Sequence, residues 1–259
     1  MFQRAWFHYL CLALVVLMQV GCTSLSADVT AKSPQVSAVA ESQGWSRFNR
    51  GVYRFNKGVD NVLLKPLAKG YQAVTPAIVD KGVTNFFENL SDVKTTVNSL
   101  LQLKGRSAAS SAGRVLVNTT VGVGGVFDVA SKVKLKKYDE DFGQTMARWG
   151  VKSGPYVMLP VLGPSTLRDA VGVAVDGFID PVNYSNYPVT LTTAKIVDKR
   201  ADLLSTEQAL KGLSSDEYSA LRDVWLQRRA FQLRDGKDDV ATQSEKADMI
   251  DLLEELEDE

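Results

Sequence analysis

The chain has 259 residues, of which 45% are apolar and 23% are charged, so it is long enough to bury a sizeable core and has a globular composition. Its 30 basic and 30 acidic residues cancel to a formal net charge of zero, which argues against nucleic acid as a partner. It contains a single histidine and two cysteines, so the choice of catalytic and metal-binding chemistry is narrow from the outset.

Residues 1–21 are predicted to be a lipoprotein signal peptide. Arg4 is followed by an uncharged run over residues 5–27 with LCLALVVLMQV at its centre, which fits a short positive region and a hydrophobic region of secretory length. The run is too short and wrongly flanked for a good membrane-spanning helix. We therefore expect this segment to be removed during export.

The letters QVGC at the end of this segment resemble a lipobox, although Gln19 stands where a leucine is usual. An ordinary secretory signal with a coincidental cysteine is the alternative. We expect cleavage before Cys22 and lipidation of Cys22 with a diacylglyceride and an N-linked chain such as palmitate, enough for stable anchoring. Because Thr23 rather than an aspartate follows, sorting to the outer membrane is expected.

Processing of this kind would remove His8 and Cys11, leaving a chain without histidine whose only cysteine, Cys22, is lipidated. Such a chain cannot form a Ser-His-Asp triad, a histidine or cysteine metal site, a cysteine nucleophile or a disulfide. Residues 22–44 lack aromatic residues and have little apolar periodicity, so they are predicted to be a flexible tether.

A helical domain is predicted over residues 45–236. Its first helix is expected from Trp45, because apolar residues recur at steps of three and four, and Pro66 is expected to end it. A second amphipathic helix is predicted over residues 85–104, with Gly105 as its stop. The apolar stripe of this second helix comprises Phe86, Leu90, Val93, Val97, Leu100 and Leu101.

The next segment contains VNTTVGVGGVFD, which looks like a phosphate-binding loop but lacks the lysine of a Walker motif. A dinucleotide fingerprint is also incomplete, because Phe127 stands where the third glycine belongs. We expect a helix, a loop and a short helix capped by Asp128. The candidate gate or hinge in this loop comprises Gly122, Gly124, Gly125 and Phe127.

The lysines of SKVKLKK alternate with apolar residues, as in a surface segment. Asp139, Glu140 and Asp141 follow; a glycosidase pair is one interpretation, but adjacent carboxylates cannot easily straddle one bond, so a charged surface turn is favoured. Glycines and prolines then exclude long regular elements until Ser165, which is expected to cap a helix reaching Ile179. The wide apolar side of that helix would suit the centre of a soluble core.

Two further helices are predicted, one over Thr192–Leu210 and one opened by Ser214 with Glu217 as a capping box. Residues 237–259 form an acidic tail that is expected to be disordered. The tail is either solvating only or a candidate carrier-binding segment through an apolar stripe. The stripe comprises Met249, Ile250, Leu252, Leu253 and Leu256.

Composition does not exclude Ser-Lys nucleophilic chemistry, but no motif in a plausible frame recommends it, so no enzyme activity and no cofactor are expected.

Seven motifs follow one another along the chain: FNRGVYRFN, PLAKGYQAVTP, VTNFFENL, VNSLLQ, GRVLVNTTVGVGGVFDVA, DFGQTMARWGVKSGPYVMLPVLGPSTLRDAVG and VDGFIDP. Together they resemble the MlaA (VacJ) family of outer-membrane lipoproteins over residues 45–225. The chain departs from that family at residues 43–47, QGWSR, where an acidic residue and a proline are common.

The resemblance implies an all-α, ring-like helical body with glycine- and proline-rich connections, partly embedded in the periplasm-facing leaflet of the outer membrane. It also implies a polar channel through which mislocalised phospholipids leave the outer leaflet, which maintains lipid asymmetry. The implied partners are trimeric porins and a periplasmic carrier of the MlaC type, in a pathway of retrograde intermembrane transport. A structural lipoprotein bound to porins without transport activity is the alternative.

Overall fold

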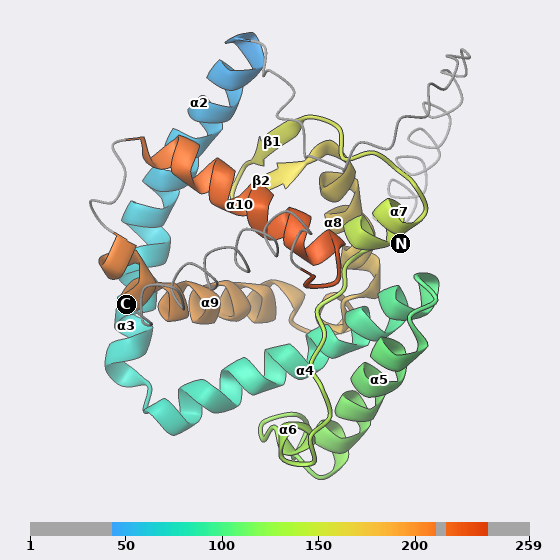
Figure 1. Ribbon diagram of the computed structural model, residues 1–259. Helices are drawn as coiled ribbons and strands as arrows, with labels where there is room; N and C mark the ends of the chain where they lie inside the picture. The colour runs from blue at the N-terminus through green and yellow to red at the C-terminus, as the bar shows by residue number, and fades with distance from the viewer. Residues whose placement is uncertain (1–42, 211–215, 238–259) are drawn as a thin grey trace, which may run out of the picture. The chain divides into compact units, whose positions relative to one another are not determined.

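The structure is a computed structural model that describes residues 43–210 and 216–237 (Figure 1). These residues form a helical body with one short antiparallel hairpin among them, which confirms the expected helical fold class. The predicted signal peptide, the Cys22 lipidation site, the tether and the apolar stripe of the tail lie outside the described residues.

The first helical path is longer than the sequence predicts. Helix α2 (Gln43–Val59) passes through the π-helix η1 (Asp60–Leu64) directly into α3 (Lys65–Val74). The expectation that Pro66 ends the helix is wrong, because the backbone stays helical through the π-helix η1 and past Pro66, the second residue of α3. The chain turns instead at Thr75 and Pro76, which are both extended.

Helix α4 (Ala77–Leu101) and helix α5 (Gly105–Thr120) lie side by side (Figure 1). Gly105 begins α5 rather than ending α4, and the turn between them is made by Leu103 at a φ of 58°. The short helix α6 (Val129–Lys132) follows the glycine-rich loop. Asp128 caps α6 by accepting a hydrogen bond from the Ser131 N–H, as the sequence predicts.

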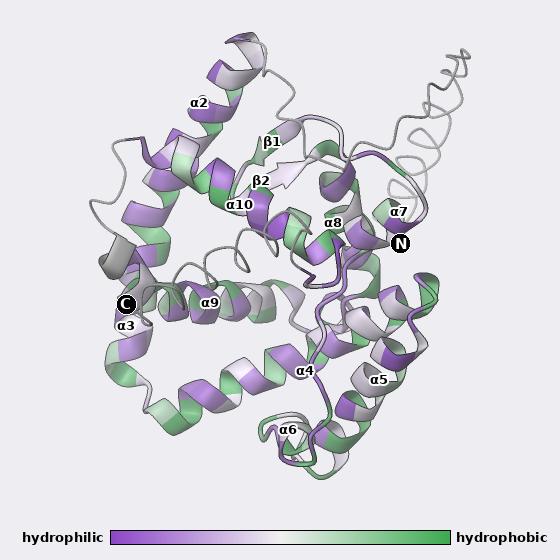
Figure 2. Ribbon diagram, in the orientation of Figure 1, coloured by the Kyte–Doolittle hydropathy of each residue, from purple (hydrophilic) through white to green (hydrophobic). Residues whose placement is uncertain are grey.

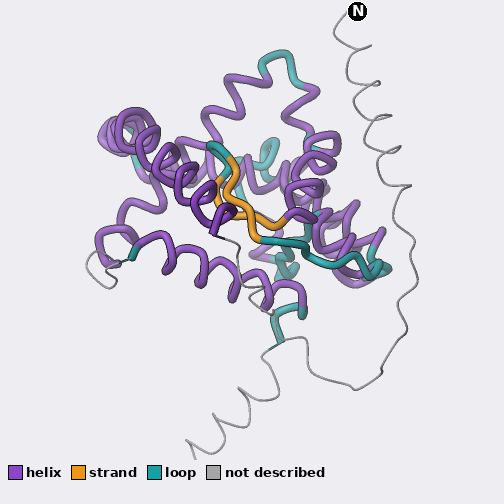
Figure 3. The backbone as a smooth tube through the Cα atoms, turned by 90° about the horizontal axis from the view of Figure 1, so that it is seen from above, coloured by secondary structure: helices purple, strands orange, loops and turns teal. Residues whose placement is uncertain are grey.

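Short elements occupy the glycine- and proline-rich region. Helix α7 (Phe142–Arg148) precedes β1 (Tyr156–Leu159) and β2 (Gly163–Thr166), which pair in antiparallel register. The hairpin contacts α2 through β1 and α10 through β2. Figure 3 shows its two strands among the helices.

Helix α8 (Leu167–Ile179) is capped by Thr166, whose hydroxyl accepts the Asp169 N–H at 3.2 Å. The predicted cap, Ser165, belongs to β2, and its hydroxyl donates to the Thr166 carbonyl instead.

The remaining elements are the 3-10 helix η2 (Pro181–Tyr184), α9 (Pro188–Leu210) and α10 (Glu217–Leu233). Helix α9 begins before the expected Thr192. The predicted capping box at Ser214 is not the observed start of α10, because the Asp216 side chain caps that helix by accepting the Ser219 N–H. Ser214 itself lies outside the described residues.

The interior of the described body is polar to an unusual degree. Its apolar clusters are small, one around Ala201 on α3 and α9 and one around Met158 at the hairpin. The largest fully buried side chain is Arg114, at 1% exposure, and most other fully buried side chains are polar. Polar and apolar residues are interspersed along the helices (Figure 2).

Helices α4 and α8 bury their polar faces. The buried residues of α4 include Asn89, Asp92 and Asn98, whereas Leu100 is exposed. On α8 the charged Asp169 is buried and the apolar Phe178 is exposed. The predicted helices are therefore confirmed. The interpretation that the apolar side of the helix ending at Ile179 lies at the centre of a soluble core is wrong. Within the described ranges, no helix has the length and apolarity needed to cross a bilayer.

Candidate functional site

Two hydrogen-bonded clusters contain many of the buried charged residues. The α7–α8–α10 cluster is centred on Arg229, and the α4–α5 cluster is centred on Arg114. The first comprises Asp141, Gln144, Arg168, Asp169 and Arg229; the second comprises Asp92, Arg114, Asn118, Asp128 and Ser131.

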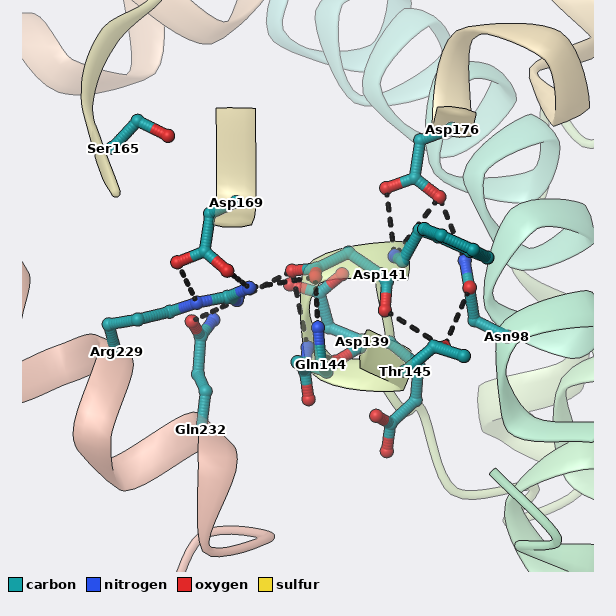
Figure 4. Close-up of polar contacts among 12 residues, drawn as sticks. Asn98, Asp139, Asp141, Gln144, Thr145, Ser165, Asp169, Asp176, Arg229 and Gln232 are labelled. Atoms are coloured by element: carbon teal, nitrogen blue, oxygen red, sulfur yellow. Dashed lines mark hydrogen bonds and ion pairs between the residues drawn. The ribbon is translucent and has the colours of Figure 1, made fainter. Parts of the chain in front are cut away.

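One guanidinium holds two carboxylates in the α7–α8–α10 cluster (Figure 4). Arg229 on α10 donates from Nη1 and Nη2 to the two carboxylate oxygens of Asp141, at 2.6 and 2.8 Å. The same guanidinium donates from Nε and Nη2 to Asp169 on α8, at 3.0 and 2.9 Å. Arg168 donates to Asp169 as well, at 3.0 Å. Paired, hydrogen-bonded charges of this kind can be accommodated away from water.

These contacts set the protonation of the cluster. Burial alone would raise the pKa of Asp141, but the hydrogen bonds from Arg229 and from the Gln144 N–H outweigh it and lower that pKa to about 2. Burial acts to lower the pKa of Arg229, and its bonds to the two carboxylates outweigh that effect and raise it. Both groups are therefore charged at neutral pH.

Two glycines allow α7 and α8 to pack closely at the α7–α8–α10 cluster. A Cβ on Gly143 would lie 2.4 Å from the Asp169 Oδ1 and 2.5 Å from the Arg229 Nη2. A Cβ on Gly172 of α8 would lie 2.6 Å from the Gly143 N. Any larger residue would force α7 and α8 apart, so the glycines of DFGQ and RDAVG serve close helix packing.

A chain of hydrogen bonds joins this cluster region to α4 (Figure 4). Asp176 on α8 accepts from the Asn98 Nδ2 at 2.8 Å and from the Phe142 N–H at 3.2 and 3.1 Å. The Thr145 hydroxyl donates to the Asn98 Oδ1 at 2.9 Å and accepts from the Gln102 Nε2 at 3.2 Å. Burial raises the pKa of Asp176 above its ordinary value.

The α4–α5 cluster anchors the segment after α5. The Arg114 Nε donates to Asp92 at 3.0 Å, its Nη2 donates to Asp128 at 3.2 Å, and its Nη1 donates to the Ser131 hydroxyl. Asn118 completes the anchor, since its amide nitrogen donates to Asp128 and its oxygen accepts the Ala130 N–H.

The predicted gate residues lie in the loop that this cluster holds. A Cβ on Gly122 would lie 2.2 Å from the Phe127 carbonyl, and a Cβ on Gly125 would lie 2.7 Å from the Asn89 side chain. Gly124, at a φ of 69°, has open space around it, and Phe127 is exposed. The loop is thus fixed at Gly122 and Gly125 and unobstructed at Gly124.

The expectation of a charged surface turn is wrong for two of its three residues. Asp139 is exposed, but Asp141 pairs with Arg229, and Glu140 is 5% exposed and accepts from the Lys104 Nζ at 2.9 Å. These partners lie 88 and 36 positions away in the chain, beyond what local patterning can detect.

Sequence reasoning missed most of the buried polar residues. The available signal was the spacing of polar residues in the second predicted helix, at steps of three and four, opposite its apolar stripe. Those polar residues are Asn85, Asn89, Asp92, Thr95, Ser99 and Gln102. Within the described part of the chain, no group of acidic, histidine or cysteine residues is placed to hold a metal ion.

Comparison with known proteins matches this chain to the family described as MlaA lipoprotein over residues 42–232. The chain belongs to the MlaA lipoprotein family. The resemblance inferred from the motifs is thereby confirmed, and DFGQ and its glycine-dependent packing are features of an MlaA-family body.

Relatives within this MlaA family include both uncharacterised and named proteins. An uncharacterised protein of Rickettsia typhi is 37% identical over 185 residues, which span 70% of this chain and 73% of that protein. The intermembrane phospholipid transport system lipoprotein MlaA of Escherichia coli (strain K12) is 33% identical over 232 residues, 87% of this chain and 88% of that protein. A solved structure reported as "Structural basis for maintenance of bacterial outer membrane lipid asymmetry" aligns with a TM-score of 0.64 and 32% identity, covering 73% of this chain and 97% of that one.

Proposed function

We propose that this protein is an outer-membrane, periplasm-facing lipoprotein that removes mislocalised phospholipids from the outer leaflet and passes them to a periplasmic carrier. The observation that carries the proposal is the reversed burial of α4, α5 and α8, which enclose charged and amide side chains and expose apolar ones. The named relative in Escherichia coli, an intermembrane phospholipid transport lipoprotein, supports the same activity here.

Reversed burial suits this task for a physical reason. A phospholipid head group carries charges that are costly to move through hydrocarbon, so a polar passage lowers the barrier while the acyl chains stay in apolar surroundings. The outer apolar residues can face lipid without that cost; Val74 is 81% exposed, Ile78 is 78% exposed and Leu103 is 92% exposed. In this proposal the body sits in the bilayer, anchored by lipidated Cys22.

The same proposal assigns the partners, the gate and the carrier-binding segment. Trimeric porins hold the body in the membrane, and a carrier of the MlaC type collects the lipid. The loop with Gly122, Gly124, Gly125 and Phe127 acts as the gate of the passage. The acidic tail of residues 237–259 binds the carrier through its apolar stripe, and the chain has no enzyme activity of its own.

The decisive experiment measures phospholipid in the outer leaflet of the source bacterium. Cells lacking the protein are compared with cells carrying it and with cells carrying Cys22→Ser. A rise in both the deletion strain and the unlipidated strain supports anchored transport out of the outer leaflet. A chain that binds porin while neither strain changes its lipid would instead be a structural scaffold.

Two additional outcomes bear on the details. Deletion of residues 238–259 is expected to weaken carrier binding, and unchanged carrier binding in that truncation would remove the tail from the proposal. Phospholipase activity in the purified protein would contradict its assignment as a non-enzymatic conduit.

A further inference from the structure

A cavity of about 620 Å³ lies beside the α7–α8–α10 cluster, between the start of α5, residues 136–140 and the end of α10. Its volume is within the usual range of small-molecule sites. Gln144 and Gln232 line it, and each also bonds a member of the cluster, Asp141 and Arg229 respectively. The cavity is therefore connected by hydrogen bonds to the polar interior.

One side of the cavity is suited to an anion. The first three residues of α5, from Gly105 to Ser107, line the cavity, and the first N–H groups of a helix have no acceptor within it. The side chains of Arg106 and Lys136 are exposed at the same cavity, and the Lys136 ammonium lies 5.1 Å from the centre of the Tyr138 ring. A helix start with two cations matches the charge of a phosphate.

The other side of the cavity is suited to a cation. Glu140 lines it at 5% exposure, and its Oε1 accepts from the Lys104 Nζ at 2.9 Å. Its Oε2 is buried and has no hydrogen-bond partner among the residues that the structure describes. Lys104 is also paired with Asp235, so one ammonium serves two carboxylates on this wall. A second ammonium, supplied by a ligand, would neutralise the second carboxylate charge on this side of the cavity and donate a hydrogen bond to the Glu140 Oε2.

We propose that this cavity binds the zwitterionic head group of a phospholipid, with the phosphate at the start of α5 beside Arg106 and Lys136 and the ammonium at Glu140. The proposal rests on the proposed transport function and specifies its substrate as an amine-bearing phospholipid. Phe231 and Tyr138 supply the apolar wall that the glycerol end of such a ligand would contact.

The test measures binding of short-chain lipids to the purified full-length protein by calorimetry. The probes are dihexanoyl phosphatidylethanolamine, dihexanoyl phosphatidylglycerol, glycerophosphoethanolamine and inorganic phosphate. We expect the ethanolamine lipid to bind about tenfold more tightly than the glycerol lipid, since its ammonium makes an additional charge-assisted hydrogen bond. Equal binding of glycerophosphoethanolamine or phosphate would identify a soluble phosphate ester as the ligand and overturn the lipid assignment.

Two variants test the phosphate side and the ammonium side of the cavity separately. Arg106→Glu with Lys136→Glu is expected to weaken both lipids about tenfold or more, and both residues are exposed, so folding should survive, as circular dichroism can verify. Glu140→Gln keeps the size of the side chain and is expected to reduce the preference for the ethanolamine lipid to about twofold. An unchanged preference in Glu140→Gln would overturn the ammonium position.

A matched control carries the same change in charge at exposed cations that do not line the cavity, Arg54→Glu with Lys81→Glu. Equal weakening in this control would show that net charge, not the cavity, governs binding. These binding measurements do not depend on transport. The head-group site can therefore be disproved while the proposed transport function stands, and transport can be disproved while the site stands.

Discussion

Arg229 illustrates how single residues hold this polar interior together. Its guanidinium is bound by both Asp141 and Asp169, so removing it would leave one buried and one partly buried carboxylate with reduced compensation. We expect Arg229→Ala to lower the free energy of unfolding by about 3–5 kcal/mol, as for other buried pairs that lose one partner. Urea unfolding in detergent, followed by tryptophan fluorescence, would measure it.

The control for this prediction is Lys57→Ala, which removes the exposed ion pair with Glu217. Exposed pairs contribute little, so a loss of at most about 1 kcal/mol is expected. If Arg229→Ala and Lys57→Ala were equally stable, the buried cluster would not be an important source of stability.

Asp141 should make stability depend on acid pH. Its pKa falls from an ordinary value of 3.8 to about 2 in the folded protein. A lowered carboxylate pKa stabilises the fold above the ordinary value and loses that contribution as the pH falls through the folded value. The contribution at neutral pH is about 2 kcal/mol, and it should fade between about pH 4 and pH 2.

Asp141→Asn tests this dependence. The variant should be less stable than the natural chain at neutral pH, and the difference should shrink as the pH is lowered from about 4 to about 2. Asp139→Asn, at the exposed neighbouring position, is the control and should leave the profile unchanged. A constant difference between the natural chain and Asp141→Asn across this range would show that Asp141 is not the titrating group.

The glycine-rich loop between α5 and α6 allows its gating role to be tested apart from its folding. Gly124→Ala places a methyl group in open space and costs about 1 kcal/mol for the left-handed backbone. Gly125→Ala adds a contact at 2.7 Å with Asn89 to the same kind of backbone strain, so it should be the more destabilising variant.

The gate hypothesis therefore depends on Gly124. We expect Gly124→Ala to stiffen the loop and raise the amount of phospholipid in the outer leaflet, while the protein remains folded and anchored. Wild-type lipid levels in cells carrying this variant at normal abundance would exclude the loop as a gate. An effect confined to Gly125→Ala would be explained by packing against α4.

Periodicity predicted which residues share a helix face, but not which face is buried. Residues 85–104 read as a helix because polar and apolar residues separate onto opposite sides, and this is observed in α4. Placing the apolar side of the helix ending at Ile179 at the centre of a soluble core assumes that water surrounds the protein. Asn98 and Asp176 bond each other across 78 positions, so their burial depends on tertiary contacts that no local pattern contains.

Local chemistry was predicted best where it acts within a few residues. The cap at Asp128 follows from hydrogen bonds to Ser131, three positions away. Pro66 misled the prediction because a proline usually interrupts a helix, whereas here the helical backbone continues through the π-helix η1 and past Pro66.

At the scale of the whole molecule, the exterior and the lipid anchor should contribute separately to membrane binding. If the exposed apolar residues face lipid, Cys22→Ser should retain partial affinity for vesicles, because apolar surface is still removed from water on binding. Replacing Val74, Ile78 and Leu103 with lysine in that background should weaken vesicle flotation about tenfold or more, since each site loses apolar contact and gains a charge.

The matched control places three lysines at exposed polar positions, Thr192, Thr193 and Gln227. This control should float with vesicles nearly as well as Cys22→Ser alone, because it removes little apolar surface. Equal loss in both triple variants would mean that charge rather than apolar contact governs binding. Complete release of Cys22→Ser, with its exterior intact, would mean that the anchor alone holds the protein to the membrane and that the reversed burial serves the polar interior only.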